Sequence, residues 1–412
     1  MLNGASVGIK TAVSYGYWFL CIASLGSFLL FPFIVNPYFR QYIFSIGIGW
    51  VIAQITLVVF FLVDDLRRGA FWTLGQVAST AGAKFMNTEQ GIPRSAFLNW
   101  IGVGVSSSLF FSLLYGFGNK YKYQLLHKKV AIKNLPSAFK GFKIIHISDI
   151  HSGSLKEKGA VQKGIDLIQQ QKADLILFTG DLVNDKATEM QDWTAIFGQL
   201  TASKGVFSTL GNHDYGDYVQ WPSKEAKAAN LDALKAVHAS MGWKLLMNEH
   251  VAIEKEGAQI KLVGIENWGA KARFPKYGQL NKALEGVDPN EVIILMSHDP
   301  SHWEAQVIPE FPQVDLMLSG HTHGMQFGLE NPYFKWSPVQ WVYKQWAGLY
   351  DQGDQKLYVN RGFGFLGYPG RVGIMPEITV LAYAVCCCQF TTLLTKSVLS
   401  NFRLVVILLT KL

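Results

Sequence analysis

The chain has 412 residues, enough for one large or two ordinary domains; 49% are hydrophobic, 16% are charged, and the formal net charge is +7. The four cysteines fit neither a zinc ribbon nor a disulfide framework, and no run of lysine and arginine is dense enough to indicate a nucleic-acid-binding protein. We therefore expect no nucleic-acid partner, and we interpret the positive charge as mild attraction to anionic lipid or phosphate. The oligomeric state stays open.

Three apolar runs stand near the start of the chain: Tyr17–Val35, Gln41–Val63 and Ser95–Gly118. Each meets the length of about 20 apolar residues that a membrane helix requires. Residues 1–120 are therefore predicted to be a membrane anchor with about three transmembrane helices, and buried helices of a soluble bundle are the alternative. A cleaved signal peptide is not expected, because two more apolar runs follow the first. Phe71–Ala83 is shorter and rich in Gly, Ser and Thr, so an interfacial or re-entrant segment is expected there.

A multi-pass membrane protein has the lipid bilayer as a partner, but the side on which its globular part lies is not fixed by charge. With three spans, the basic residues on the two sides of the anchor are nearly equal in number. The densest basic cluster follows the third apolar run immediately and includes Lys120, Lys122, Lys128 and Lys129. That cluster favours a cytoplasmic globular part.

Residues 121–139 are predicted to be a linker, and residues 140–381 an α/β domain. Short aliphatic runs in this domain are typical of buried strands: Phe142–Ile147, Leu175–Thr179, Val206–Leu210, Lys261–Ile265, Val292–Met296, Val314–Leu318, Lys356–Val359 and Ile378–Leu381. Apolar residues at helical spacing predict helices within Leu155–Lys172 and Lys224–Met241, so strands and helices alternate as in α/β layers. Residues 382–412, with Cys386, Cys387 and Cys388, are predicted to be an apolar C-terminal extension, and a fourth span is the alternative.

Polar motifs stand where five of the predicted strands stop: Asp149-Ile150-His151, Gly180-Asp181, Gly211-Asn212-His213-Asp214, Ser297-His298-Asp299 and Gly320-His321-Thr322-His323. In α/β sheets, ligands gather at the carboxyl ends of strands. Taken singly, such residues are usually turn formers or surface groups. Their ordered placement instead indicates one site in which carboxylates, an amide and imidazoles hold two divalent metals.

This series of motifs resembles that of the calcineurin-like metallophosphoesterases, and the apolar N-terminal runs suggest a membrane-anchored bacterial branch. The resemblance implies a four-layer α-β-β-α sandwich of two mixed sheets, preceded by the transmembrane region. It also implies that one metal takes Asp149, His151, Asp181 and His323, and that the second takes Asp181, Asn212, His298 and His321. Asp181 would bridge the two ions. Oxygen and nitrogen ligands without thiolate suit Mn, Fe or Zn and do not separate them.

The resemblance implies a phosphoesterase in which a metal-bridging hydroxide attacks phosphorus in line. His213 corresponds to the catalytic histidine of the family that is not a ligand. Many relatives orient it with an aspartate at the position of Asn184. Here the candidates are Asp214, Asp185 or a neutral amide in place of a carboxylate. Arg361 and Arg371 lie in a glycine-rich segment that either binds phosphate or packs on the core.

The substrate class is less well defined, because phosphate monoesters, phosphodiesters and pyrophosphates all suit such a site. The segment Asn331–Tyr350 holds three tryptophans and four other aromatic residues, and it shapes a lipid-facing entrance or packs as an ordinary loop. The resemblance to membrane-associated bacterial members of the family implies a lipid-linked phosphodiester or pyrophosphate, of which a nucleotide-linked acylated glucosamine is one candidate. The alternative function is a membrane sensor or binding protein with a catalytically silent domain.

Overall fold

The computed structural model describes residues 6–80, 94–271, 274 and 276–385, and the chain divides into two compact units. The helical unit comprises Met1–Lys122, Gly324–Pro338 and Gly364–Pro376. The sheet unit comprises Tyr123–His323, Val339–Phe363 and Glu377–Leu412. Two segments from the C-terminal half of the chain therefore belong to the same unit as the N-terminal helices.

The described part of the helical unit is built mainly of α1 (Val7–Leu30), α2 (Pro37–Thr80) and α3 (Arg94–Gly116). The side chain of Ser6 caps α1 by accepting a hydrogen bond from the amide of Ile9. Each helix is long and apolar enough to cross a membrane. Large apolar side chains such as Trp18 and Phe111 are more than half exposed, as lipid-facing residues of a membrane helix are. The predicted transmembrane region is confirmed.

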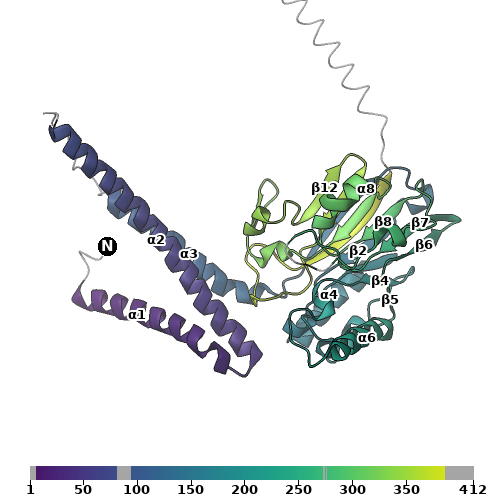
Figure 1. The fold of residues 1–412 in the computed structure, drawn as a ribbon, viewed down its shortest axis with the longest axis horizontal. Helices are drawn as coiled ribbons and strands as arrows, with labels where there is room; N and C mark the ends of the chain where they lie inside the picture. Colours follow the sequence, from purple (N-terminus) through teal and green to yellow (C-terminus); the bar gives the residue numbers. More distant parts are fainter. Residues whose placement is uncertain (1–5, 81–93, 272–273, 275, 386–412) are drawn as a thin grey trace, which may run out of the picture. The chain divides into compact units, whose positions relative to one another are not determined.

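The membrane helices pack through small residues, as is common when no hydrophobic effect drives helices together in lipid. A Cβ on Gly47 would lie 2.2 Å from the Oγ of Ser27, and the hydroxyl of Ser24 donates to the carbonyl of Gly47 at 3.0 Å. These contacts join α1 to α2. A Cβ on Gly102 would lie 2.8 Å from the Cβ of Phe60, so α2 and α3 also approach closely and lie side by side (Figure 1).

The second helix differs from its prediction, because α2 continues without a break through Phe71 to Thr80. A re-entrant segment would need a turn that this helix does not contain. After Pro37, its first residue, α2 has no proline. Its charges are satisfied within the helix: Arg67 pairs with Asp64 at 2.8 Å and Arg68 with Asp65 at 3.5 Å. Residues 81–83 of the predicted segment lie outside the described residues.

The described part of the sheet unit contains two six-stranded sheets. The first has the order β1 (Gln124–Ile132), β14 (Glu377–Val385), β2 (Lys143–Ile147), β3 (Leu175–Thr179), β4 (Val206–Thr209) and β5 (Trp243–Leu245). The second has the order β12 (Gly348–Gln352), β13 (Gln355–Val359), β9 (Leu316–Ser319), β8 (Ile293–Met296), β7 (Ala258–Gly264) and β6 (Glu249–Lys255). Both are mixed, because β14 is antiparallel to β2, and the edge strands β12 and β6 are antiparallel to their neighbours.

The two sheets face each other across one core that contains Leu177 of the first sheet and Leu262 and Leu318 of the second. The outer face of the first sheet carries α4 (Lys158–Gln170) and α6 (Lys224–Ser240) (Figure 1), and the short α5 (Thr194–Phe197) contacts α4. The outer face of the second packs against α7 (Leu280–Ala283) and the turn that leads into α8 (Ile308–Glu310). The four layers are therefore helix, sheet, sheet and helix, which confirms the predicted fold class.

Two boundaries lie elsewhere than the sequence patterns suggested. Residues 124–132 of the expected linker form β1, which pairs with β14 in parallel from Gln124–Glu377 to Ile132–Val385. Only Val130 and Ile132 of β1 are fully buried, so the strand carries little of the apolar pattern that marks a core strand. Residues 382–385 of the expected extension complete β14, and residues 386–412, with the three adjacent cysteines, lie outside the described residues.

Candidate metal centre

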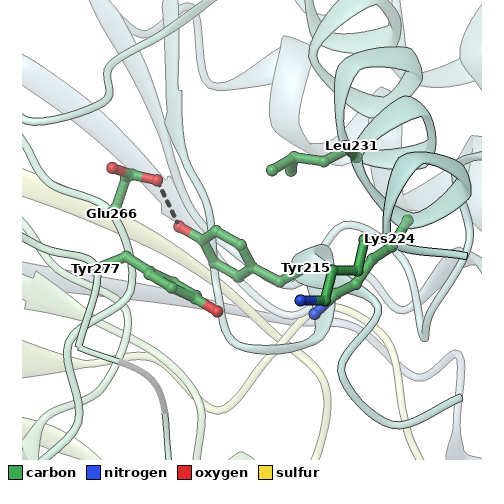
Figure 2. A pocket seen from close by; sticks show the side chains of 7 residues that line it. Tyr215, Lys224, Leu231, Glu266 and Tyr277 are labelled. Atoms are coloured by element: carbon green, nitrogen blue, oxygen red, sulfur yellow. Dashed lines mark hydrogen bonds between the residues drawn. The ribbon is translucent and has the colours of Figure 1, made fainter.

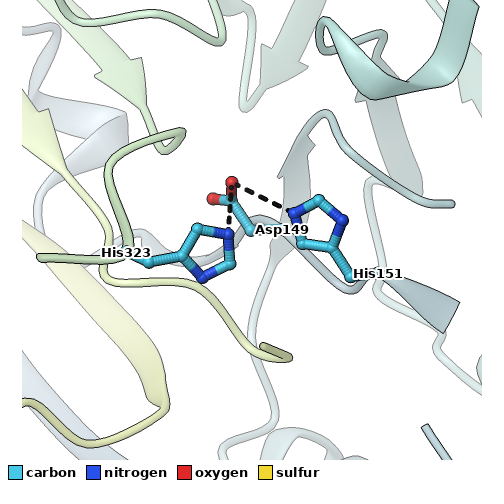
Figure 3. A group of neighbouring side chains, drawn as sticks. All are labelled: Asp149, His151 and His323. Carbon is cyan, nitrogen blue, oxygen red and sulfur yellow. Dashed lines mark ion pairs between the residues drawn. The ribbon is translucent and has the colours of Figure 1, made fainter. Parts of the chain in front are cut away.

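Two groups of metal-type side chains lie where the strands of both sheets end. Asp149, His151 and His323 form the first group, which Figure 3 shows, and Asp181, His298 and His321 form the second. Within each group one ligand atom per residue lies within 4.8 Å of the others. In the first group, Oδ1 of Asp149 lies 3.3 Å from Nε2 of His323 and 4.0 Å from Nε2 of His151.

Asp181 connects the two groups. Its Oδ2 lies 3.1 Å from Nε2 of His298 and 3.6 Å from Nε2 of His151. Asn212 adds a neutral oxygen, since its Oδ1 lies 2.8 Å from Nδ1 of His321. The structure thus brings together all seven side chains of the expected ligand set, with the Asp181 carboxylate between His151 of one group and His298 of the other.

The backbone is strained at this site. The expected ligands Asp149, His151, Asp181, His321 and His323 all have φ between 48° and 71°. For residues other than glycine, such conformations cost on the order of 1–3 kcal/mol each and persist only where the surroundings enforce them. Five such residues at one place indicate that the site geometry is selected at the expense of local backbone energy.

Close backbone approach explains two of the glycines in the motifs. Gly180 has φ 93°, and a Cβ there would lie 2.4 Å from the amide nitrogen of Gly211. A Cβ on Gly320 would lie 1.8 Å from the Oγ of Ser148 and 2.2 Å from Oδ2 of Asp149. Both positions therefore require glycine for the carboxylates to reach the site.

The donor set fits divalent cations. His151 is fully buried, and neither of its ring nitrogens has a hydrogen-bond partner among the described residues. Burial lowers the pKa of His151 to about 3, so its imidazole is neutral and free to donate a lone pair. The Nδ1–H of His298 donates to the carbonyl of Thr179 at 2.7 Å, which orients the ring so that Nε2 faces Asp181.

The charges of the site also call for cations. Burial opposes ionisation of Asp149 and Asp181, but the imidazoles of His323 and His298 outweigh it and hold the pKa of both carboxyls below the usual range. Burial lowers the pKa of His298, and the Asp181 carboxylate outweighs burial and raises it to about 10. With no metal bound, the proton therefore sits on His298 beside the buried carboxylates. Divalent ions held by the same side chains would supply stronger positive charge there.

Two tyrosines that the motifs did not indicate hold the ligands in orientation. The amide of Asn212 donates to the hydroxyl of Tyr218 at 2.8 Å, which leaves the Asn212 oxygen directed at His321. The hydroxyl of Tyr343 donates to Asp299 at 3.2 Å and lies 2.8 Å from Nε2 of His321. With Nε2–H donating to that hydroxyl, the Nδ1 of His321 is left to bind an ion.

His213 lies beside the ligands without joining either group. Its amide donates to Oδ1 of Asp181 at 2.9 Å, and its Nδ1 lies 2.8 Å from the backbone carbonyl of Asn184. A carbonyl can only accept, so Nδ1 carries the proton, and Nε2 is left for other partners. The open question of the orienting group is therefore answered by the main chain of Asn184. Asp214 instead accepts the amides of Asp181, Leu182 and Gly211.

The two arginines singled out from the sequence are buried and engaged elsewhere. Arg361 is 5% exposed and forms an ion pair with Glu377. Arg371 is fully buried, and its guanidinium donates to the carbonyls of Gly364 and Met375. These contacts favour packing over phosphate binding for both residues.

The turn that carries His213 also forms one wall of a cavity of about 290 Å³, which Figure 2 shows. Its lining residues are Tyr215, Lys224, Lys227, Ala228, Leu231, Glu266 and Tyr277. The rings of Tyr215 and Tyr277 lie 4.4 Å apart, and the Tyr215 hydroxyl donates to Glu266 at 3.1 Å. Aromatic faces beside lysines give this cavity an amphipathic, partly cationic wall.

Comparison with known proteins decides the family. Residues 142–325 match the profile of the calcineurin-like phosphoesterases. The metallophosphoesterase YkuE of Bacillus subtilis is 30% identical over 253 residues, which make up 60% of this chain and 80% of YkuE. The chain belongs to the calcineurin-like metallophosphoesterases. Residues 5–119 of this metallophosphoesterase also match a family described as a probable calcineurin-like phosphoesterase transmembrane domain.

Other metallophosphoesterases also match this chain. The phosphodiesterase YaeI of Escherichia coli is 29% identical over 242 residues, 58% of this chain and 81% of YaeI. A transmembrane protein with a metallophosphoesterase domain from Danio rerio is 29% identical over 258 residues, 61% of this chain. That match covers 55% of the Danio rerio protein, so the chain spans about half the length of that relative. The family that the motifs predicted and the membrane region that the apolar runs predicted are both confirmed.

Proposed function

We propose that this membrane metallophosphoesterase hydrolyses a phosphate ester or pyrophosphate bond with two divalent metals, of which Mn, Fe and Zn all suit the ligands. The observation that carries the proposal is the convergence of two ligand groups on Asp181, which contacts His151 on one side and His298 on the other. Two divalent metals that share one carboxylate would activate water and neutralise charge on the phosphoryl oxygens.

The side-chain positions support the ligand roles that the family resemblance implies. Asp149, His151, Asp181 and His323 would hold one ion, and Asp181, Asn212, His298 and His321 the other. The protein supplies two carboxylates against two dications, so the loaded site keeps net positive charge. Such a field favours binding of an anionic phosphate.

We assign His213 the proton transfer. The Asn184 carbonyl fixes its Nδ1–H, so its Nε2 is the nitrogen that holds the proton for the leaving group when the ring is protonated. The ring centroid of His213 lies 5.0 Å from that of His151 and 4.5 Å from that of Tyr218. His213 therefore stands beside a ligand and against an aromatic wall that limits its movement.

A hydrolysis assay on the purified full chain in detergent, with a generic aryl phosphodiester and added Mn²⁺, tests the proposal. Wild type should turn over the substrate, and Asp181→Ala should abolish turnover because it removes the ligand shared by both ions. Wild type that binds metal but hydrolyses none of a panel of monoesters, diesters and pyrophosphates would favour the alternative, a membrane sensor or binding protein with a silent domain.

We further propose that the substrate is lipid-linked. The support is the membrane anchor together with the aromatic segment Asn331–Tyr350. The aromatic side chains of this segment form a buried set and an exposed set. Tyr343 and Trp346 are buried, whereas Tyr333 and Trp341 are 98% and 74% exposed. The exposed set suits contact with lipid. If replacing Tyr333 and Trp341 by serine slows hydrolysis of lipid phosphates and water-soluble esters equally, this proposal fails.

We also propose that the metal-binding domain lies in the cytoplasm, on the strength of the basic cluster that follows α3. Protease treatment of intact cells tests the proposal directly. The domain should be protected until the membrane is opened, and cleavage from outside intact cells would contradict it.

A further inference from the structure

The aromatic and lysine residues at one end of the α2–α3 pair mark where these helices leave the membrane. The rings of Tyr42, at the start of α2, and Phe117, just after α3, lie 4.8 Å apart. The ammonium of Lys120 donates to the Tyr42 hydroxyl at 2.8 Å. Tyrosine is enriched at the boundary between lipid and water, and lysine is frequent beside the ends of membrane helices.

The segment Gly364–Pro376 is attached to these helix ends. The Arg371 amide donates to the carbonyl of Gly116 at 3.0 Å, and the Asn119 side chain donates back to the Arg371 carbonyl at 3.0 Å. The Tyr368 hydroxyl donates to the carbonyl of Leu113. A Cβ on Gly116 would lie 2.2 Å from the Tyr368 hydroxyl, so the two surfaces meet without a gap. Gly364–Pro376 therefore lies at the level of the lipid–water boundary.

The segment Gly324–Pro338 is in turn attached to Gly364–Pro376. The side chain of Gln326 donates to the carbonyl of Tyr368 at 2.7 Å and accepts from the amide of Leu366 at 2.7 Å. The amide of Gly328 donates to the carbonyl of Val372 at 2.9 Å. These bonds fix the base of a hairpin that consists of β10 (Leu329–Glu330) and β11 (Lys335–Trp336).

The tip of this hairpin is a rigid turn that presents aromatic rings outward. Oδ1 of Asn331 accepts the amides of Tyr333 and Phe334, each at 2.9 Å, and the Asn331 amide donates to the Phe334 carbonyl at 2.9 Å. Tyr333 is 98% exposed, Phe334 52% and Leu329 60%. The turn is well bonded, and its apolar groups are exposed among the described residues, so they are available for a contact with another surface.

We propose that the hairpin Leu329–Trp336 inserts its tip into the lipid–water interface beside the exit of α2 and α3. Continuity of the hairpin with the lipid-exposed helices, through Gly364–Pro376, identifies the bilayer as its partner. Gly324, the first residue of the segment Gly324–Pro338 that carries the hairpin, directly follows the expected metal ligand His323. The insertion does not depend on the proposed activity, because it concerns only the helical unit.

Depth measurement on the full chain in nanodiscs of phosphatidylcholine and phosphatidylglycerol tests this insertion. Tyr333→Cys, in a chain whose native cysteines are replaced by serine, carries an environment-sensitive fluorophore. Its emission should shift to shorter wavelength and be quenched by lipids that bear a nitroxide near the headgroup. The matched control is Glu256→Cys in the polar, exposed turn between β6 and β7, where an aqueous quencher should act instead.

Three outcomes would overturn the proposal. The label at position 333 could respond to the aqueous quencher like the control, which would show that the tip stays in water. It could be shielded from both quenchers, which would show that protein covers the tip. It could change with protein concentration at constant lipid, which would identify a second copy of the chain as the partner.

Discussion

Replacing Tyr343 by phenylalanine should weaken metal binding without unfolding the protein. The Tyr343 hydroxyl contacts Nε2 of His321 at 2.8 Å and Asp299 at 3.2 Å, and the variant loses both contacts. A hydrogen bond to a charged group contributes about 1.5–3 kcal/mol. Since about 1.4 kcal/mol is tenfold in an equilibrium constant, the dissociation constant for Mn²⁺ should rise by roughly 10- to 100-fold, as for other residues that orient metal ligands.

Isothermal titration calorimetry of the metal-free chain with Mn²⁺ measures this effect directly. Tyr383→Phe is the matched control, because Tyr383 is 3% exposed and its hydroxyl has no hydrogen-bond partner within the described part of the chain. The control should bind Mn²⁺ as wild type does. Equal affinities in Tyr343→Phe and Tyr383→Phe would refute the argument that the Tyr343 hydroxyl orients His321.

Three further predictions concern proton transfer, packing and pH. His213→Ala should keep its metals by elemental analysis while turnover falls by about 10²- to 10⁴-fold, and loss of metal would contradict the role of His213 as a non-ligand. Gly320→Ala should lower the melting temperature, because its Cβ would lie 1.8 Å from Ser148 Oγ. Gly159→Ala is the control and should leave the melting temperature unchanged, because a Cβ there meets nothing within 4 Å among the described residues outside its own helical turn. Burial lowers the pKa of His238 to about 3 from an ordinary value of about 6.5, so its contribution to stability is complete above pH 6.5 and is lost as pH falls toward 3. The melting temperature of His238→Gln should accordingly fall less than that of wild type as pH is lowered over that range. Equal dependence of the two melting temperatures on pH would exclude His238 as a source of the acid destabilisation.

The site could be predicted from the sequence because each ligand stands in a short motif at the end of an apolar strand. Asp149 follows β2 and Asp181 follows β3, and parallel strands bring their carboxyl ends to one edge of a sheet. That geometry makes the order of motifs along the chain informative about distances in space. The family resemblance then assigned each residue to one ion or the other.

The groups that orient the ligands could not be predicted in the same way. His213 is held by the backbone carbonyl of Asn184, and a carbonyl is present whatever residue stands there. Tyr343 reaches His321 from a segment that the sequence marked only as aromatic. A search for tyrosines within reach of the ligands needs the fold first.

The contacts and boundaries that the sequence did not predict have two physical reasons: main-chain hydrogen bonds, and charged side chains that pair inside a helix. The docking of Tyr368 on Leu113 joins residues 255 positions apart through main-chain carbonyls, which leave no pattern in the sequence. The same holds for β1, where only Val130 and Ile132 are fully buried and pairing with β14 is made by the backbone. In α2, charged residues such as Arg67 and Asp64 pair with each other inside the helix. The helix therefore continues past the point where the apolar run gives way to charged residues.

Counting metals per chain tests the central claim most directly. Elemental analysis of the full chain, purified in detergent and saturated with Mn²⁺, should give two ions for wild type and His213→Ala, and fewer than two for Asp181→Ala. Wild type with no bound ion, or Asp181→Ala that still holds two, would contradict a centre in which one carboxylate bridges two metals.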